Sequence, residues 1–133
     1  MVQKDYNWLI TDIVAYPKTK EYQDLFSKEY CWLSGEELTN IIEKEDFQWI
    51  WGVLSGFEKS IDIKEILNHS LPYTDDYEGF WKNPFSLQHP LASIEIVAWD
   101  SSLSLIISKS KQIIDNFRLT FPLSEDLEIY NGS

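Results

Sequence analysis

Residues 91–118 constrain the fold most strongly, because they read as two strands and a helix in direct succession. Residues 93–99 and 103–108 are apolar and rich in β-branched side chains, which favour strands. The three residues between them are Asp, Ser and Ser, which favour a turn. Over residues 109–118 the apolar side chains recur at helical spacing. This stretch predicts an antiparallel hairpin followed by a helix that can cover one side of it.

Two earlier stretches predict further strands. Residues 6–16 are rich in β-forming residues and are stopped by Pro17. Residues 47–57 are mostly apolar on both faces, which is typical of an interior strand. Together with the hairpin they predict an α+β fold, with an antiparallel sheet of about four to five strands and helices packed on one face. With 133 residues in the chain, we expect a single α+β domain over residues 1–133.

Helix starts are marked by capping residues. Ser34 followed by Glu37 forms a capping box ahead of a helix predicted at residues 35–45. Asp62 has the same relation to a shorter apolar stripe that ends before Pro72.

The net charge of −11 restricts the partners that the chain can bind. An acidic surface repels nucleic acids and anionic membranes, so we expect neither as a partner. A basic protein partner fits the charge, because opposite fields speed association. The acidity is explained equally well as a means of keeping a cytosolic protein soluble.

Localisation is predicted to be cytoplasmic. Asp5 and Asp12 interrupt any apolar leader near the start, and no apolar window is long enough to span a bilayer. Cys31 is the single cysteine, which excludes an internal disulfide and agrees with a reducing compartment.

The segment 73–90 is the best candidate for a recognition surface. It is irregular, proline-containing, aromatic and acidic, and long loops in compact domains are often functional. Its carboxylates, together with the acidic run that ends the helix at 35–45, would hold a cationic partner. Its aromatic rings would anchor that partner. The competing interpretation is that both acidic stretches are simply solvated. The candidate binding residues are Asp75, Asp76, Tyr77, Glu78 and Trp81 in the loop, and Glu43, Glu45 and Asp46 in the run.

An alternative site involves the tryptophans of the strand at 47–57. Trp49 and Trp51 are two residues apart and are expected on the same face, beside Gly52. They would line a pocket for a small molecule, in a binding or enzymatic domain, with His89 and the loop aspartates as polar groups. Packing of the rings against a helix is the competing interpretation.

Catalytic and metal-binding motifs are not found in the sequence. His69 and His89 lack the spacing of metal ligands and are expected to be surface or capping residues. Cys31 has little basic surroundings and is expected to be buried and inert. Ser55 lacks the G-x-S-x-G context of a nucleophile, and no phosphate-binding glycine motif occurs. We therefore expect no catalytic residue, no metal site and no cofactor.

Three stretches carry a resemblance to a known family. They are WGVLSGF at 51–57, IEIVAWDSS at 94–102 and FPLSEDL at 121–127. Here the chain resembles small acidic proteins of Bacillus-type bacteria, a family with no assigned function, over residues of about 45–133. The shared motifs are structural, so the resemblance implies no catalytic residue.

Size and charge are those of bacterial immunity proteins, which neutralise a secreted toxin; this is an association only. The sequence thus favours a non-enzymatic acidic binding protein, and an immunity or antitoxin-like inhibitor of a basic protein partner is its most concrete form. A small-molecule or enzymatic domain with a Trp-lined pocket, and a scaffold or homo-oligomer, are the alternatives.

Overall fold

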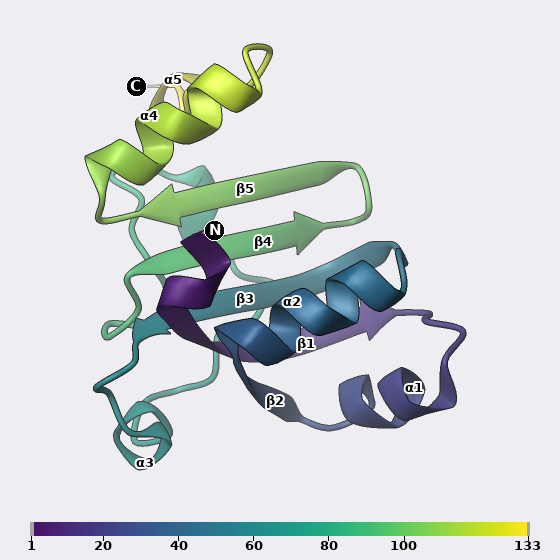
Figure 1. Cartoon of the computed structure of the whole chain (residues 1–133). Coiled ribbons are helices and arrows are strands. Elements are labelled where there is room, and N and C mark those ends of the chain that lie inside the picture. Colours follow the sequence, from purple (N-terminus) through teal and green to yellow (C-terminus); the bar gives the residue numbers. More distant parts are fainter. Residues whose placement is uncertain (1, 133) are drawn as a thin grey trace.

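A five-stranded antiparallel sheet forms the centre of the molecule (Figure 1). The computed structural model describes residues 2–132, and its strands follow the order β2-β1-β3-β4-β5 across the sheet. This confirms the α+β class, and all four predicted strands are present. The strands are β1 (Tyr6–Ala15), β2 (Tyr30–Ser34), β3 (Trp49–Glu58), β4 (Ile94–Trp99) and β5 (Leu103–Ser108).

The helices begin at capped residues. Ser34 Oγ accepts a hydrogen bond from the Glu37 amide at 3.1 Å, and the Glu37 carboxylate accepts one from the Ser34 amide at 3.0 Å, so the predicted capping box is confirmed. The helix after the hairpin begins at Lys111 because Ser110 caps it. The helices are α1 (Lys20–Phe26), α2 (Gly35–Lys44), α3 (Ile63–Ile66), α4 (Lys111–Thr120) and α5 (Leu127–Asn131), with 3-10 turns η1 (Val2–Asp5) and η2 (Gly79–Trp81).

One side of the sheet, the helix face, is covered by α1 and α2 (Figure 1). Because side chains alternate along a strand, every second residue of each strand points to this face. The buried residues packed together here are Trp8, Ile10, Tyr22, Phe26, Cys31, Leu33, Leu38, Ile41, Leu54 and Ile94. This cluster is the largest part of the core, and burial of these side chains is its main source of stability.

The opposite side, the loop face, is covered by residues 59–93. This segment is mostly irregular, and it contains α3 and η2. Ile66 of α3 packs with Leu9 and Phe57, while Phe80 of η2 packs with Val53 and Val97. The predicted recognition segment therefore lies against the sheet and forms part of the cover of the loop face.

A β-bulge in β3 overturns the expectation that Trp49 and Trp51 share a face. Trp51 pairs with Val14 and Trp49 pairs with the adjacent Ala15, so Ile50 has no partner in β1. An extra residue of this kind reverses the alternation of side chains. Trp49 consequently packs on the helix face, whereas Trp51 contacts Trp99.

Within residues 2–132, no helix is long and apolar enough to cross a membrane.

Candidate functional site

A buried carboxylate lies beneath the loop face. Glu95 of β4 has no exposed surface, and its oxygens accept hydrogen bonds from Ser55 Oγ at 2.8 Å, the Gln88 amide at 2.6 Å and the His89 amide at 3.2 Å. Burial raises the pKa of Glu95, and these bonds act in the opposite direction. Two of the three donors are backbone groups of the loop, so Glu95 fastens residues 88–89 to the sheet.

His89 is buried, which corrects the expectation of a surface or capping residue. Its Nδ1 accepts from the Leu91 amide at 3.1 Å, so Nε2 carries the proton and donates to the Ile66 carbonyl at 3.0 Å. Burial lowers the pKa of His89, which keeps the ring neutral. Both ring nitrogens are thus occupied, and the contact with Glu95 runs through the backbone. Ser55, Glu95 and His89 do not form a proton-transfer relay.

The loop carboxylates have separate roles. Thr74 donates from its amide at 2.8 Å and from its hydroxyl at 2.5 Å to Asp12 of β1, which ties the loop to the sheet. Asp75 and Asp76 follow and are exposed. Glu78 pairs with Lys82 at 2.6 Å on the surface.

The loop rings point inward more than the carboxylates do. Tyr77 is half-buried and packs edge-on to Tyr73 and Phe80. The ring of Tyr77, predicted as a binding residue, thus packs against the chain's own core and anchors the loop there.

The acidic run after α2 is partly used for structure. Glu45 accepts from the Lys18 amide at 2.6 Å and the Thr19 amide at 2.9 Å, just before α1. The Thr19 hydroxyl, with these amides and Lys18, lowers the pKa of Glu45. Glu43 and Asp46 are exposed.

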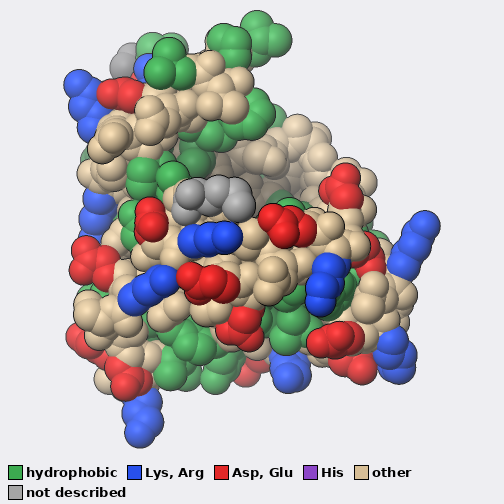
Figure 2. Space-filling model, in the orientation of Figure 1, with side chains coloured by type: hydrophobic (Ala, Val, Ile, Leu, Met, Phe, Trp, Pro, Cys, Tyr) green, Lys and Arg blue, Asp and Glu red, His purple; other side chains and the backbone are tan. Residues whose placement is uncertain are grey.

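The two predicted acidic stretches do not form one surface. Residues 43–46 span the end of α2, on the helix face, while residues 73–78 cover the loop face. Acidic and basic side chains are also interspersed over α1 and α2 (Figure 2). The sheet therefore separates the two sets of residues that the sequence analysis grouped together.

A row of four aromatic rings crosses the loop face at the hairpin end of the sheet. The ring centroids of Trp51 and Trp99 are 5.1 Å apart, those of Trp99 and Trp81 are 5.1 Å apart, and those of Trp81 and Tyr130 are 5.9 Å apart. Each of the tryptophans is half-buried, and Tyr130 is 55% exposed. Trp49 is not part of this aromatic row. His89 contacts Phe57 and His69 instead.

The aromatic row ends in a groove of about 480 Å³, which we call the β5 groove. It runs along the whole of β5 and is bounded by α4, α5 and the chain between them. Of the eight predicted binding residues, only Trp81 lines it. The lining residues are Trp81, Phe85, Leu103, Ser104, Leu105, Ile106, Ile107, Ser108, Ile114, Phe117, Arg118, Leu123, Ser124, Glu125, Asp126, Leu127, Glu128 and Tyr130.

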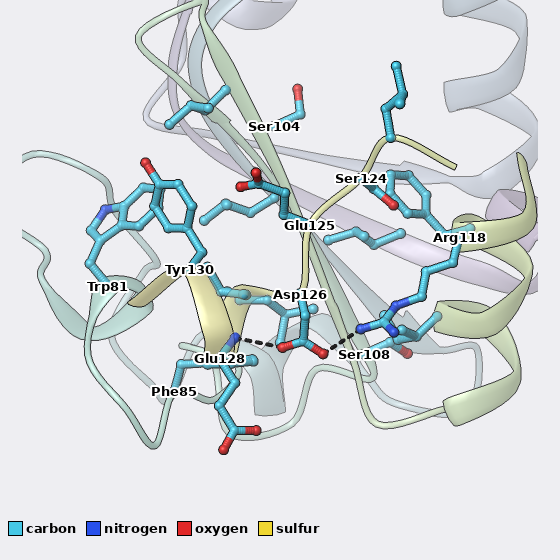
Figure 3. A pocket seen from close by; sticks show the side chains of 18 residues that line it. Trp81, Phe85, Ser104, Ser108, Arg118, Ser124, Glu125, Asp126, Glu128 and Tyr130 are labelled. Carbon is cyan, nitrogen blue, oxygen red and sulfur yellow. Dashed lines mark hydrogen bonds and ion pairs between the residues drawn. The ribbon is translucent and has the colours of Figure 1, made fainter. Parts of the chain in front are cut away.

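Charged groups divide the β5 groove. Figure 3 shows Trp81 and Tyr130 at one end and Arg118 at the other, with Asp126 between them. Asp126 accepts from Arg118 at 2.5 Å and from the Glu128 amide at 2.9 Å, which caps α5. The bond from Arg118 is the main reason that the pKa of Asp126 is lowered.

The sequence analysis missed this groove, although signals for it were present. Apolar residues of the C-terminal part remain exposed: Leu123 is 96% exposed and Ile129 is 80% exposed. Neither α4 nor α5 contains a buried residue. The available signal was a short C-terminal stretch that has more apolar side chains than its helices bury.

Chemically, the groove offers an apolar floor, aromatic rings and carboxylates. Within residues 2–132, no group of three or more His, Cys, Asp or Glu side chains is arranged to hold a metal ion. Cys31 is buried on the helix face, and burial raises the pKa of its thiol to about 11, which makes it a poor nucleophile. No family model, curated protein or solved structure matches the chain.

Proposed function

We propose that this protein is a non-enzymatic acidic binding protein whose partner is a basic protein, most concretely an immunity or antitoxin-like inhibitor of a toxin. It acts in the cytoplasm, where a single unpaired cysteine is stable. The observation that carries the proposal is the β5 groove, in which exposed rings lie beside an excess of carboxylates.

Charge supports a cationic partner. Among the groove residues, Glu125, Asp126 and Glu128 are opposed by Arg118 alone. The whole chain carries a net charge of −11, so the field outside the groove has the same sign. Exposed acids elsewhere, including Glu43 and Asp46, add to the field that draws in a basic protein.

Aromatic rings supply the anchoring contacts. Trp81 and Tyr130 are in contact and line one end of the groove. Partly exposed Trp and Tyr are enriched among the residues that dominate interface energies. Their faces also attract Lys and Arg side chains, by about 0.5–1 kcal/mol at exposed sites.

The buried polar groups support a binding role over a catalytic one. Ser55, Glu95 and His89 are the most suggestive set of side chains for catalysis. Their hydrogen-bonding atoms are already engaged with each other and with the loop backbone.

The experiment titrates the purified protein with the products of neighbouring genes, each alone, by calorimetry. We expect one basic product to bind, and binding to weaken about tenfold or more in a Glu125→Gln/Glu128→Gln variant, since each rim charge affects association. The matched control is Glu21→Gln/Glu29→Gln, which makes the same charge change near the opposite edge of the sheet and leaves binding nearly unchanged.

A basic product that binds the two variants equally contradicts the groove as the site. The absence of any basic binder, together with cells that become sensitive to no toxin when the gene is deleted, contradicts the proposed function.

The second candidate is a small-molecule-binding or enzymatic domain, which is favoured by the groove's volume. About 480 Å³ lies within the range of ligand pockets, roughly 300–1,000 Å³. A metabolite library screened by thermal shift tests this alternative, with Tyr130→Ala as the variant that should abolish any shift. Light scattering at two concentrations tests the scaffold or homo-oligomer, for which the measured mass rises with concentration.

A further inference from the structure

The open side of β5 is the feature from which the inference starts. β5 is the last strand of the sheet and pairs only with β4. The Lys109 amide donates to the Ser93 carbonyl at 3.1 Å, which continues the β4–β5 ladder by one more pair. Because antiparallel pairs alternate, the backbone groups of Leu103, Leu105 and Ile107 point to β4. Those of the intervening residues point outward.

The outward residues are Ser104, Ile106 and Ser108. Within residues 2–132, no backbone hydrogen bond beyond the sheet ladders reaches their N–H and C=O groups. All three residues line the β5 groove, as do the residues between them. The groove therefore contains a row of unsatisfied backbone donors and acceptors along one side.

The composition of β5 leaves this edge unprotected. Edge strands usually carry charged residues or proline, are very short, or are covered by a helix or loop, which prevents pairing with another chain. β5 is six residues long and reads Leu-Ser-Leu-Ile-Ile-Ser, with neither a charge nor a proline. α4, α5 and the chain between them border the groove, which covers part of the edge and hinders pairing with a flat sheet. An edge of this kind is suited to pair with one added strand.

The walls of the groove would receive alternate side chains of such a strand. Ile114 and Phe117 of α4 and Leu127 and Tyr130 of α5 line the groove. Ile113 of α4 packs with the core of the helix face, whereas Leu127 of α5 packs with the core of the loop face, so the two helices lie toward opposite sides of the sheet. Side chains of an added strand alternate between the two sides of the sheet, so each wall would meet every second residue. This is the arrangement by which strand addition combines backbone affinity with side-chain specificity.

Charge decides between the possible occupants. A second copy of this chain would bring another net charge of −11 to the contact, which opposes association. Glu125 and Glu128 on the groove favour Lys or Arg in the added strand. The occupant that the charges favour is an extended basic segment of another protein.

We propose that the β5 groove takes up an extended, basic segment of the partner protein as a sixth strand, hydrogen-bonded to Ser104, Ile106 and Ser108. This rests on the proposed function, because it identifies how the basic partner is held. It adds a backbone-directed mode of recognition that charge attraction alone does not require.

The probe is an eight-residue capped peptide in which Lys and Arg alternate with Val and Thr. Two companions accompany it: an acidic peptide with Glu in place of Lys and Arg, and the basic peptide methylated at alternate backbone nitrogens. Hydrogen exchange of the whole protein is followed by NMR at each amide of β5. In the free protein, we expect the amides of Ser104, Ile106 and Ser108 to exchange faster than those of Leu105 and Ile107.

The basic peptide is expected to slow exchange at the three outward amides about tenfold or more, and the methylated peptide to bind about tenfold more weakly or worse. Ser104→Pro removes one outward N–H and is expected to weaken binding similarly, because edge positions tolerate proline without loss of the fold. Ser104→Ala is the matched control, since it retains the N–H and should bind as the wild type does.

Three outcomes overturn strand addition: unchanged exchange at the outward amides, equal binding of the methylated peptide, and no binding of the basic peptide at millimolar concentration. None of these outcomes decides the proposed function, which the titration with basic gene products tests separately. Equal binding of the acidic peptide, with slowed exchange, contradicts a basic occupant and overturns the proposal as well. A mass that doubles at high concentration and returns to the monomer value in Ser104→Pro identifies a second copy as the occupant, which overturns the proposal.

Discussion

At the scale of single residues, Glu95 is a buried carboxylate held by hydrogen bonds. Within residues 2–132, no ion pair reaches it. Both of its oxygens accept hydrogen bonds, from Ser55 and from two loop amides. A buried acceptor with this many donors is costly to remove, because the donors are left without partners.

Glu95→Ala is expected to lower the free energy of unfolding by about 2–4 kcal/mol, since three donors lose their acceptor and a buried side chain is lost. Urea unfolding followed by fluorescence measures the change. Glu58→Ala, at an exposed position of β3, serves as the control and should shift stability by about 0.5 kcal/mol or less. Equal effects of the two substitutions would contradict the anchoring role.

The titration of Glu95 is expected to make stability depend on pH. Burial raises its pKa above the ordinary value of 4.5, so the folded protein retains a proton that the unfolded chain has released. Stability therefore falls as the pH rises from 4.5 through the folded pKa. The unfolding free energy of the wild type minus that of Glu95→Gln should decrease over this range; a constant difference would contradict a raised pKa.

Two glycines of β3 are expected to respond differently to the same substitution. A Cβ at Gly56 would lie 2.6 Å from Ile94 Cγ2 and 3.1 Å from the Trp8 ring, whereas the nearest atom at Gly52 is 3.6 Å away. Gly56→Ala should cost about 1–3 kcal/mol of unfolding free energy through overpacking. Gly52→Ala is the matched control and should cost less than about 1 kcal/mol, by thermal unfolding of both variants. Comparable losses would show that the contact with Ile94 is not the cause.

At the scale of elements, α5 is attached to the body by its ends. Asp126 caps its first turn, and Asn131 near its end donates to the Phe80 carbonyl at 2.9 Å. Leu127 adds an apolar contact with the core of the loop face. A five-residue helix is not stable alone, so these contacts decide whether it forms.

Asp126→Ala is expected to speed amide exchange across residues 127–131 while leaving β3 unchanged, because it removes both the cap and the pair with Arg118. Asp126→Asn keeps a capping oxygen and loses only the charge, so it should retain most of the protection. Hydrogen exchange by NMR measures both variants. Equal exchange in the two would show that the charge pair, and not the cap, holds α5.

Local signals in the sequence were sufficient to predict several elements. The hairpin, the capping box of α2 and the interior strand follow from turn residues, capping spacing and apolar runs, all of which act over a few residues. Strand β2 was missed because its five residues follow a helical pattern directly. The bulge at Ile50 could not be predicted, since it depends on pairing with Val14 and Ala15 far along the chain.

The candidate site was predicted less well than the fold, for a related reason. Trp81 was identified from its aromatic loop, but its ring partners, Trp99 and Tyr130, come from β4 and α5. The groove exists because the edge of β5 and the two helices meet in space, which no short window of sequence encodes. His89 was misplaced because its buried partners, Ile66 and Phe57, lie more than 20 residues away.

At the scale of the whole molecule, the net charge of −11 opposes compaction. Raising the ionic strength from about 0.01 M to about 0.15 M shortens the Debye length from about 30 Å to about 8 Å. We expect the melting temperature to rise by about 2–5 °C over this range, as repulsion between carboxylates is screened. The melting temperature of a Glu21→Lys/Glu29→Lys variant should rise by less, because this variant is less acidic overall. Calorimetry measures the melting temperature of both proteins at both salt concentrations. An equal rise in the two proteins would contradict the prediction.

The carboxylates that hold the loop face also affect how freely this protein can diversify. Glu95 and Asp12 bind the loop largely through amide groups, at residues 74, 88 and 89, which every amino acid except proline provides. Exposed positions between these points, such as Asp75, can therefore change without loosening the attachment, whereas Asp76 has a φ of 63° and favours Asp, Asn or Gly. A lineage could vary the outer surface of the loop generation after generation while the two strand carboxylates stayed constant.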